Sequence, residues 1–256
     1  MELEFTSVSH EGPVSRLTLS RPERRNALSL GLMREVIAVL ADLPEETEVV
    51  VIAGQGPAFS AGHDLAEMLD RDPAFYGELF KVCTEMMEIV HEVPQPVVAR
   101  VHGAAYAAGC QLVAACDLAV AADSATFATP GVKIGLFCST PMVPVSRAIG
   151  RKRAMEMLLT GEPISASTAQ EWGLVNRVVP AERLDETVDG LLEQITSYSP
   201  QVIGIGKKAF YAQVDLDEQR AYDIARSVMA SNAEHDDAQE GIGAFVEKRQ
   251  PSWSTR

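Results

Sequence analysis

The fold class is decided by one segment, residues 101–136, which reads VHGAAYAAGCQLVAACDLAVAADSATFATPGVKIGL. It begins at the end of an apolar run over 96–103, continues through Gly- and Ala-rich residues, and reaches a second apolar run over 117–123. Short apolar runs are typical of buried parallel strands, and the small residues between them predict a tightly packed helix. A strand, a helix and another strand in this order predict a right-handed parallel crossover.

The same pattern extends toward the N-terminus and predicts an α/β fold. Strand patterns occupy 14–20 and 48–54, and apolar residues at helical spacing occupy 29–42 and about 65–90. Because strands and helices alternate, the strands are expected to form a mainly parallel sheet.

Beyond residue 140 the pattern changes to helices. One further strand is expected at 173–179, and the helices are expected at 141–149, 151–159, 165–172, 182–197, 201–213, 217–232 and 234–248. We therefore divide the chain into a core, residues 1–195, and a helical C-terminal region, residues 196–256. The second part has apolar helix faces but few strands to cover, which predicts packing on another subunit.

Composition restricts the class of protein. The chain has 256 residues, of which 46% are hydrophobic and 23% charged, as in a soluble protein with one large domain or one domain with an appended subdomain. A net charge of −14 argues against a nucleic-acid surface, although local basic residues can still bind a small anion. The four cysteines and five histidines show no metal-ligand spacing, so no metal site is expected. No apolar run is long enough to span a membrane, and the N-terminal residues resemble neither a signal nor a transit peptide, so we expect a cytoplasmic protein.

Two loops could together bind a carbonyl oxygen. AFSAGHDL (58–65) and HGAAYAAGCQL (102–112) each follow an expected strand and lead into a helix, where backbone N–H groups lack intrahelical partners. Gly62 and Gly109 allow close approach of the backbone to a ligand. Two converging N–H groups would stabilise an oxygen that becomes negative, by about 3 kcal/mol each. The alternative is that both loops are ordinary turns whose small residues serve helix–sheet packing.

Four segments together resemble the crotonase superfamily, the enoyl-CoA hydratase/isomerase group. They are AFSAGHDL, the segment 101–136, RAMEMLLTGEPISASTAQEWGLVNRVVP and EGIGAFVEKR, and they span nearly the whole chain in order. The resemblance implies a spiral of ββα repeats with a helical C-terminal region, and trimers that often pair into hexamers. It also implies a coenzyme A thioester as the ligand, with CoA part of the substrate and no tightly bound cofactor.

The resemblance also implies the site residues. The oxygen would be held by the backbone N–H groups of His63 and Ala108. Substrate and CoA contacts would come from Arg24, Arg25, Ala61, Gly62, Asp64 and Leu65, and from Phe245 and Lys248 in the tail, often of a neighbouring subunit. Two alternatives stay open: Asp64 as the N-cap of a helix that starts at Leu65, and Lys248 as a solvated helix end.

The chain departs from the family at the two glutamates that move the proton and the water in hydratases. Gln111 and Gly131 occupy those positions. Glutamine can orient a water but cannot act as a general base, and loss of proton transfer costs about 10²–10⁴-fold for each group. Some relatives have a further carboxylate near the position of Ser139, where this chain has none. Other candidates for proton transfer are the His63 imidazole, Cys138, Glu67, and Glu85 or Glu88, for which wall or surface roles are the alternative.

Three functions are compatible with these sequence features. The first is an enzyme that stabilises an enolate of a fatty acyl- or enoyl-CoA through the His63 and Ala108 amides, with an atypical proton relay. The second is a catalytically weak or inactive acyl-CoA-binding protein that modulates lipid metabolism. The third is a protein whose oligomer surface is its function, against which the two loops and the Phe245/Lys248 tail argue.

Overall fold

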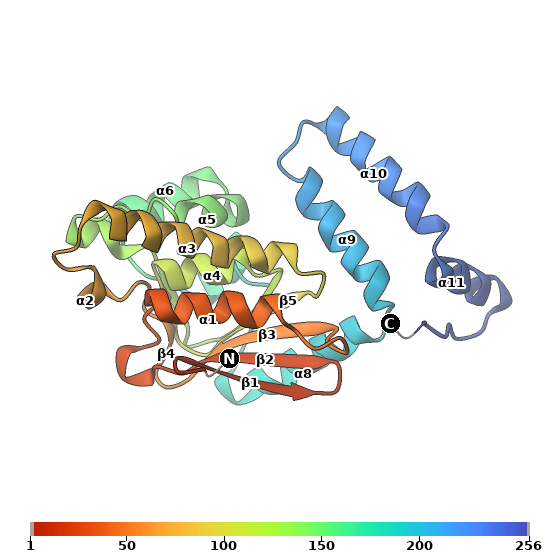
Figure 1. The fold of residues 1–256 in the computed structure, drawn as a ribbon, viewed down its shortest axis with the longest axis horizontal. Coiled ribbons are helices and arrows are strands. Elements are labelled where there is room, and N and C mark those ends of the chain that lie inside the picture. The colour runs from red at the N-terminus through yellow and green to blue at the C-terminus, as the bar shows by residue number, and fades with distance from the viewer. Residues whose placement is uncertain (1–2, 255–256) are drawn as a thin grey trace.

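The structure is a computed structural model that describes residues 3–254, and a six-stranded sheet forms its centre (Figure 1). The strand order is β1-β2-β3-β5-β7-β10, with β1 antiparallel to β2 and the other neighbours parallel. The strands are β1 (Thr6–Glu11), β2 (Val14–Leu19), β3 (Val49–Gly54), β5 (Val97–Val101), β7 (Leu118–Ala122) and β10 (Arg177–Val179).

A second, smaller sheet has the order β4-β6-β8-β9. Its strands are β4 (Ala58–Ser60), β6 (Ala104–Tyr106), β8 (Thr126–Ala128) and β9 (Ile164–Ser165). Each of the pairs β3–β4, β5–β6 and β7–β8 gives one strand to each sheet and is followed by helical structure. The chain therefore climbs as a spiral of ββα repeats, which confirms the predicted fold class, and β4, β6 and β8 all end at one side of the molecule.

Alternate residues of the large sheet face different helices. One face packs against α1 (Leu30–Ala41) and α3 (Pro73–Glu92), which bury leucine, methionine and valine side chains between them. The opposite face, which includes Val49, Val51 and Val120, packs against α8 (Leu184–Thr196). Burial on both faces explains why these strands read as continuous apolar runs.

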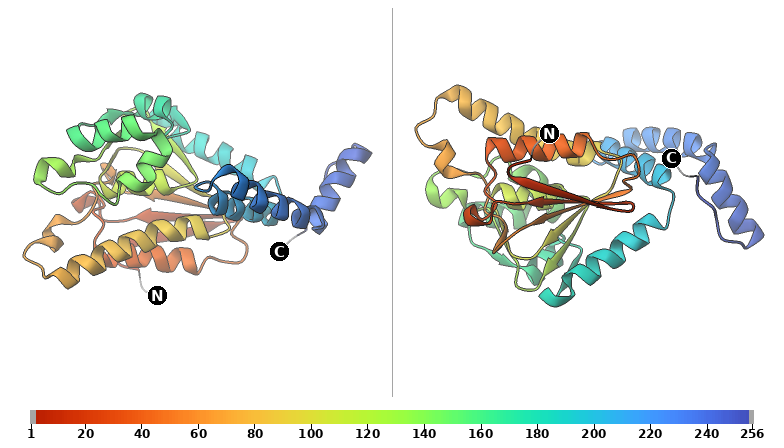
Figure 2. Two further views of the ribbon diagram at one scale, coloured as in Figure 1. Left: turned by 90° about the horizontal axis from the view of Figure 1, so that it is seen from above. Right: turned by 60° about the horizontal axis from the view of Figure 1, so that its bottom comes forward.

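The remaining helices lie around the smaller sheet and at the C-terminus. They are α2 (Leu65–Met68), α4 (Ala108–Ala115), α5 (Met142–Ile149), α6 (Arg151–Thr160), α7 (Ala166–Trp172), α9 (Pro200–Gln213), α10 (Glu218–Ala233) and α11 (Asp236–Glu247), with short 3-10 turns at Pro22–Arg24, Pro130–Ile134 and Ala181–Arg183. Figures 1 and 2 show α10 and α11 projecting from the body, at the end of the molecule opposite α2. No helix within residues 3–254 is long and apolar enough to cross a membrane.

A buried cluster, which we call the α9 anchor, attaches α9 to the core. The Lys207 ammonium donates to the carbonyl oxygens of Val90 (2.7 Å) and Gln95 (2.8 Å) and pairs with Asp117 at 2.6 Å. The Tyr211 hydroxyl donates to the other Asp117 oxygen at 2.8 Å. The Tyr211 ring also stacks on His91, with the ring centroids 3.9 Å apart. Burial lowers the pKa of Lys207, and Asp117 opposes that shift.

Two local expectations from the sequence are corrected. The helix expected over about 65–90 is broken into α2 and α3, because Asp70 has φ +53° and Asp72 caps α3 by accepting a hydrogen bond from the Phe75 N–H. Pro73 at the first turn of α3 reinforces the break. The strand patterns also missed elements: none was located at β1 or in the smaller sheet. The helices beyond residue 140 lie close to their expected positions. The predicted boundary at 195/196 falls at the end of α8, and the division into two parts stays a prediction.

Candidate active site

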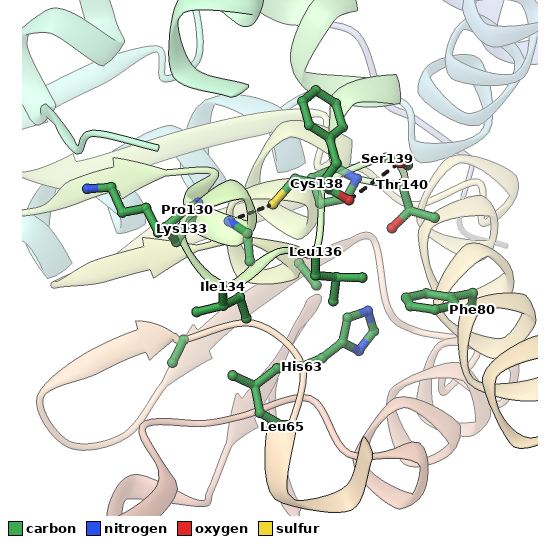
Figure 3. Close-up of a pocket in the computed structure, with 16 residues that line it drawn as sticks. His63, Leu65, Phe80, Pro130, Lys133, Ile134, Leu136, Cys138, Ser139 and Thr140 are labelled. Carbon is green, nitrogen blue, oxygen red and sulfur yellow. Dashed lines mark hydrogen bonds between the residues drawn. The ribbon is translucent and has the colours of Figure 1, made fainter. Parts of the chain in front are cut away.

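A cavity of about 630 Å³, which we call the site cavity, lies where β4, β6 and β8 end (Figure 3). Its wall comes from the loop after β4, from the start of α4, from residues 130–141 after β8, and from Phe80 of α3. The residues are Ala61, His63, Leu65, Phe80, Ala107, Ala108, Pro130, Gly131, Lys133, Ile134, Leu136, Phe137, Cys138, Ser139, Thr140 and Pro141. Most of them are apolar, which suits an acyl chain.

The loop after β4 is held by Leu28. The Leu28 N–H donates to the Gly62 carbonyl at 2.8 Å, and the Asp64 N–H donates to the Leu28 carbonyl at 3.3 Å. His63 forms the bridge partner of Leu28 between these two bonds. Because backbone groups of successive residues point in opposite directions along an extended segment, the His63 N–H points away from Leu28.

Asn26 fixes the same loop from behind and was missed in the sequence. Its side-chain amide nitrogen donates to the carbonyl oxygens of Gln55, Ala58 and Phe59. The backbone carbonyl oxygen of Asn26 accepts a hydrogen bond from the Ser60 hydroxyl at 2.8 Å. Asn26 is fully buried with φ +52°, a conformation that Asn tolerates better than most residues. A lone Asn in the motif RRNAL was the available signal.

The second loop reaches the cavity through a strained residue. Ala107, the N-cap of α4, has φ +49° and ψ −118°, a region that residues with a Cβ rarely occupy. Ala108 is the first residue of α4, and α4 packs so closely on β4 that a Cβ at Gly109 would lie 2.4 Å from the Ser60 carbonyl oxygen. A Cβ on Gly62 would lie 2.7 Å from the Ala107 methyl and 3.3 Å from the Ala108 nitrogen. The two loops are therefore in direct contact.

Two backbone amides are left open at this contact. Within residues 3–254, neither the His63 N–H nor the Ala108 N–H donates a hydrogen bond. Both residues line the cavity, as the sequence predicted for the pair. Orphan N–H groups from adjacent backbones can hold an oxygen that gains negative charge, and the N-terminus of α4 adds its partial positive charge.

Gln111 does not reach the cavity. Its side chain is buried at 3% exposure, and its carbonyl oxygen lies 3.8 Å from the Cys83 thiol, which donates to it. Burial raises the pKa of Cys83 to about 12, so the thiol keeps its proton. The hydrogen bond to the Gln111 side chain therefore comes from a side chain of α3 and not from backbone groups of the α4 N-terminus.

At the other glutamate position the backbone itself fills the space. A Cβ on Gly131 would lie 2.0 Å from the Leu136 carbonyl oxygen and 2.8 Å from the Cys138 sulfur. The loop closes on Gly131 because the Leu136 N–H donates to its carbonyl and its own N–H donates to the Cys138 sulfur. No side chain fits there unless residues 131–138 move. Burial raises the pKa of Cys138, which makes it a wall residue and a poor nucleophile.

Within residues 3–254, the ring nitrogens of the His63 imidazole make no hydrogen bond in the cavity. The ring projects between Phe80 and Leu136 (Figure 3), edge-on to the Phe80 ring at a centroid distance of 5.5 Å. Both ring nitrogens are buried and have no hydrogen-bond partner among the described residues. Burial lowers the pKa of His63, and the Leu28 backbone opposes that shift more weakly. The ring is therefore neutral at pH 7.

Only some of the other predicted contact residues line the cavity. Ala61 and Leu65 line it, whereas Gly62 supports it from behind. Asp64 stands at the N-cap of α2 but its side chain makes no cap; it pairs with Arg21 at 3.1 Å. Glu67, Glu85 and Glu88 do not line the cavity.

The remaining predicted residues are exposed. Arg24 and Arg25 lie on the surface just before Asn26, and the Arg25 carbonyl accepts from the Ala61 N–H at 2.9 Å. Phe245, 86% exposed, and Lys248 lie at the end of α11, across the molecule from the cavity (Figure 1). A single chain does not bring this tail to its own site.

The cavity mouth is apolar and carries one charged group. Leu65, Ile134, Leu136 and Phe137 are exposed by 40–60%. The Lys133 ammonium pairs with Glu162 at 2.8 Å on the surface. Within residues 3–254, no group of three or more His, Cys, Asp or Glu side chains could hold a metal ion.

Comparisons with known proteins find similar sequences along nearly the whole chain. A family model described as Enoyl-CoA hydratase/isomerase matches residues 9–256. The chain is 46% identical over 258 residues to a mouse (Mus musculus) protein named Enoyl-CoA hydratase domain-containing protein 3, mitochondrial, with 99% of this chain and 85% of that protein covered. The human (Homo sapiens) protein of the same name is 44% identical over 252 residues, covering 97% and 83%.

Solved structures agree with the fold over the whole chain. The crystal structure of an enoyl-CoA hydratase from Mycobacterium smegmatis matches with a TM-score of 0.96 and 45% identity, covering 98% of this chain and 99% of that one. The structure of human enoyl coenzyme A hydratase domain-containing protein 3 matches with a TM-score of 0.95 and 43% identity, covering 98% and 100%.

The names of the relatives contradict the expected cytoplasmic location. The mouse, rat and human proteins are named mitochondrial. The expectation was wrong because it relied on the lack of a leader pattern, and such a lack carries no information on location.

Proposed function

The chain belongs to the enoyl-CoA hydratase/isomerase family, the crotonase superfamily, and from that premise we propose that it binds fatty acyl- or enoyl-CoA thioesters in the site cavity. The thioester oxygen accepts hydrogen bonds from the His63 and Ala108 amides, and the acyl chain lies along the apolar wall. CoA is part of the substrate and is released with it. The observation that carries the proposal is the pair of unpartnered amides at the contact between the two loops.

Enolate stabilisation follows from this binding mode. When the thioester loses an α-proton, its oxygen gains negative charge, and the two amides and the N-terminus of α4 then bind it more strongly than the neutral carbonyl. Water addition is slow, because no carboxylate among residues 3–254 lines the cavity. The Gln111 side chain is buried against α3, and the loop fills the space at Gly131.

The same two observations favour a second function, an acyl-CoA-binding protein with little or no catalysis that modulates lipid metabolism. A hydration assay separates the two. We expect crotonyl-CoA to bind but to be hydrated about 10²-fold or more slowly than by a hydratase with both glutamates. A hydration rate within about tenfold of such an enzyme would contradict the role given to the missing carboxylates.

A direct test of the oxygen contact uses two ligands of equal size. We expect octanoyl-CoA to bind at least about tenfold more tightly than the thioether analogue that lacks the carbonyl oxygen, since hydrogen bonds to that oxygen contribute about 1–3 kcal/mol. Calorimetry measures both constants on the wild-type protein. Equal affinities would contradict the proposal.

A variant adds an independent check. Gly62→Ala places a methyl against Ala107 at a residue with φ +94°, which pushes the two loops apart. We expect it to lose the preference for the thioester over the thioether. Gly77→Ala, whose Cβ would meet nothing within 4 Å, is the matched control and should keep the preference.

We propose further that the chain forms trimers, or hexamers of paired trimers, through residues 196–256. Phe245 and Lys248 do not line the cavity of their own chain, and exposed apolar side chains on α10 and α11 such as Met229 and Ile242 favour contact with another copy. Light scattering behind size exclusion tests the stoichiometry, and a monomer at micromolar concentration would contradict it.

A further inference from the structure

The His63 imidazole is unlike the other histidines of the chain. His10, His91, His102 and His235 each have one ring nitrogen within hydrogen-bond distance of a neighbour. His63 has none, although its nitrogens are buried. An unsatisfied buried polar group costs about 1–3 kcal/mol, so a structural role does not account for this ring.

Its surroundings leave proton transfer in the cavity to this ring. Of the other lining residues, the Lys133 ammonium has no free lone pair and is paired with Glu162 at the surface. The Cys138 thiol is kept protonated by burial, which raises its pKa. The hydroxyls of Ser139 and Thr140 are too weakly basic to take a proton near neutral pH.

The position of the ring relative to the oxygen site follows from covalent structure. The amide that holds the thioester oxygen and the imidazole belong to the same residue, so a few bonds separate them. The α-carbon of the ligand is likewise two bonds from the oxygen. Since the His63 ring projects into the same cavity (Figure 3), an acyl group held at this amide has its α-carbon within a few bonds' length of the ring.

We propose that the His63 imidazole is the catalytic base of this site: it takes the α-proton of a bound 3-enoyl-CoA thioester and returns that proton at the γ-carbon. The inference rests on the proposed binding of acyl-CoA in the site cavity. It assigns to a side chain of the first loop the work that the absent glutamates do not perform.

The step is balanced without water or a redox partner. The unprotonated ring nitrogen takes the α-proton, the C–H electron pair forms a double bond between the α-carbon and the carbonyl carbon, and the carbonyl π pair moves to the oxygen. The His63 and Ala108 amides hold the resulting dienolate. The imidazolium then returns the proton to the γ-carbon, which leaves the double bond between the α- and β-carbons.

The charges around the ring suit a base that is protonated only during the reaction. On its own loop Asp64 is paired with Arg21, α3 presents the neutral Phe80, residues 130–141 present Lys133 at the rim and the neutral Cys138, and α4 presents its positive N-terminus. The Leu28 backbone favours an imidazolium, but more weakly than burial disfavours it. The dienolate stabilises the imidazolium, because the two charges form a pair in an apolar environment.

The test follows trans-3-hexenoyl-CoA in D₂O, with deuterium at the α- and γ-carbons and the absorbance of the conjugated thioester as readouts. We expect wild type to exchange and isomerise, and His63→Gln to lose about 10²-fold or more in kcat, with KM changed by less than about threefold. The amide donor is retained in this variant. His10→Gln, on the exposed strand β1, is the control and should behave as wild type.

A structural role would not reproduce two further readouts. Because the pKa of His63 lies below its usual value, kcat should be flat above pH 6.5 and fall at lower pH, and this fall should disappear from the residual rate of His63→Gln. Free imidazole should restore part of the rate of His63→Ala. A His63→Gln rate within about threefold of wild type overturns the inference.

The inference and the proposed function fail in different ways. If wild type binds octanoyl-CoA but neither exchanges deuterium nor isomerises 3-hexenoyl-CoA, the inference is overturned and the binding function stands. If octanoyl-CoA does not bind, the proposed function is overturned and the inference with it.

Discussion

The α9 anchor and the site cavity both bury polar groups, and they treat them in opposite ways. In the anchor the Lys207 ammonium has three oxygen partners and Asp117 accepts from Lys207, Tyr211 and the Val97 N–H. In the cavity the His63 ring and the amides of His63 and Ala108 have no partner within residues 3–254. The anchor is complete in the free protein, whereas the cavity is not.

The difference separates polar groups that hold the fold from polar groups that await a ligand. Completed networks in a low-dielectric interior are costly to break, because each removed partner leaves a desolvated group behind. Buried polar groups without a hydrogen-bond partner have the desolvation cost already in the free protein. Changes in the anchor should therefore destabilise the protein, and changes that remove open groups from the cavity should stabilise it.

Removal of the anchor lysine has the largest expected effect. Lys207→Ala leaves Asp117 and the carbonyls of Val90 and Gln95 without their donor, so the free energy of unfolding should fall by about 3–5 kcal/mol. Chemical denaturation measures the loss. Lys208→Ala, one residue away and exposed, should change stability by less than about 0.5 kcal/mol. Equal effects of the two variants would show that the anchor does not hold α9.

A glutamate in place of Gly131 tests whether the site cavity can accept the missing carboxylate. Because a Cβ there would lie 2.0 Å from the Leu136 carbonyl oxygen, Gly131→Glu should displace residues 131–138 and cost about 1–3 kcal/mol. It should gain no hydration of crotonyl-CoA. Gly190→Ala, whose Cβ meets nothing within 4 Å inside α8, should be stabilising by about 0.5–1 kcal/mol. A stable Gly131→Glu protein that hydrates crotonyl-CoA would refute the blocked-loop interpretation.

Strands β2, β3, β5 and β7 of the large sheet were predictable from the sequence, because each has five or six residues with a visible apolar pattern, as in the run VVVIAG of β3. The smaller sheet was not, since β4, β6 and β8 have three residues each and are strands only through pairing with distant segments. Too few residues remain in AFS, AAY or TFA for any period to be visible.

The site divides in the same way. The motif pointed to His63 and Ala108, which line the cavity, and the role proposed for their amides depends on backbone position alone. The Gln111 side chain could not be placed, since its direction depends on how α4 sits against α3. Asn26 and the closure of the loop on Gly131 were likewise invisible, because both depend on contacts between segments distant in the sequence.

A third change removes an open group from the cavity. His63→Leu replaces a ring with two unsatisfied nitrogens by an apolar side chain, so the free energy of unfolding at pH 7 should rise by about 1–2 kcal/mol. Proton exchange on 3-hexenoyl-CoA should be lost at the same time. His102→Leu is the matched control: its ring is bonded to the Gly56 carbonyl, so that variant should be destabilised by about 1 kcal/mol. A destabilised His63→Leu protein would mean that the ring has a structural partner.

The smallest expected effect concerns the backbone of the cavity. Ala107 has φ +49° and ψ −118°, which costs an alanine about 1–3 kcal/mol. Ala107→Gly removes that strain but gives the unfolded chain about 0.4–1 kcal/mol of extra entropy, so the net gain should be about 1 kcal/mol in thermal or chemical unfolding. Ala105→Gly, in the regular strand β6, has the entropy cost without relief of strain and should be destabilised. If both variants lose stability equally, the strain at Ala107 is not stored in the protein, and the contrast between a relaxed anchor and a strained cavity would rest on the unpaired polar groups alone.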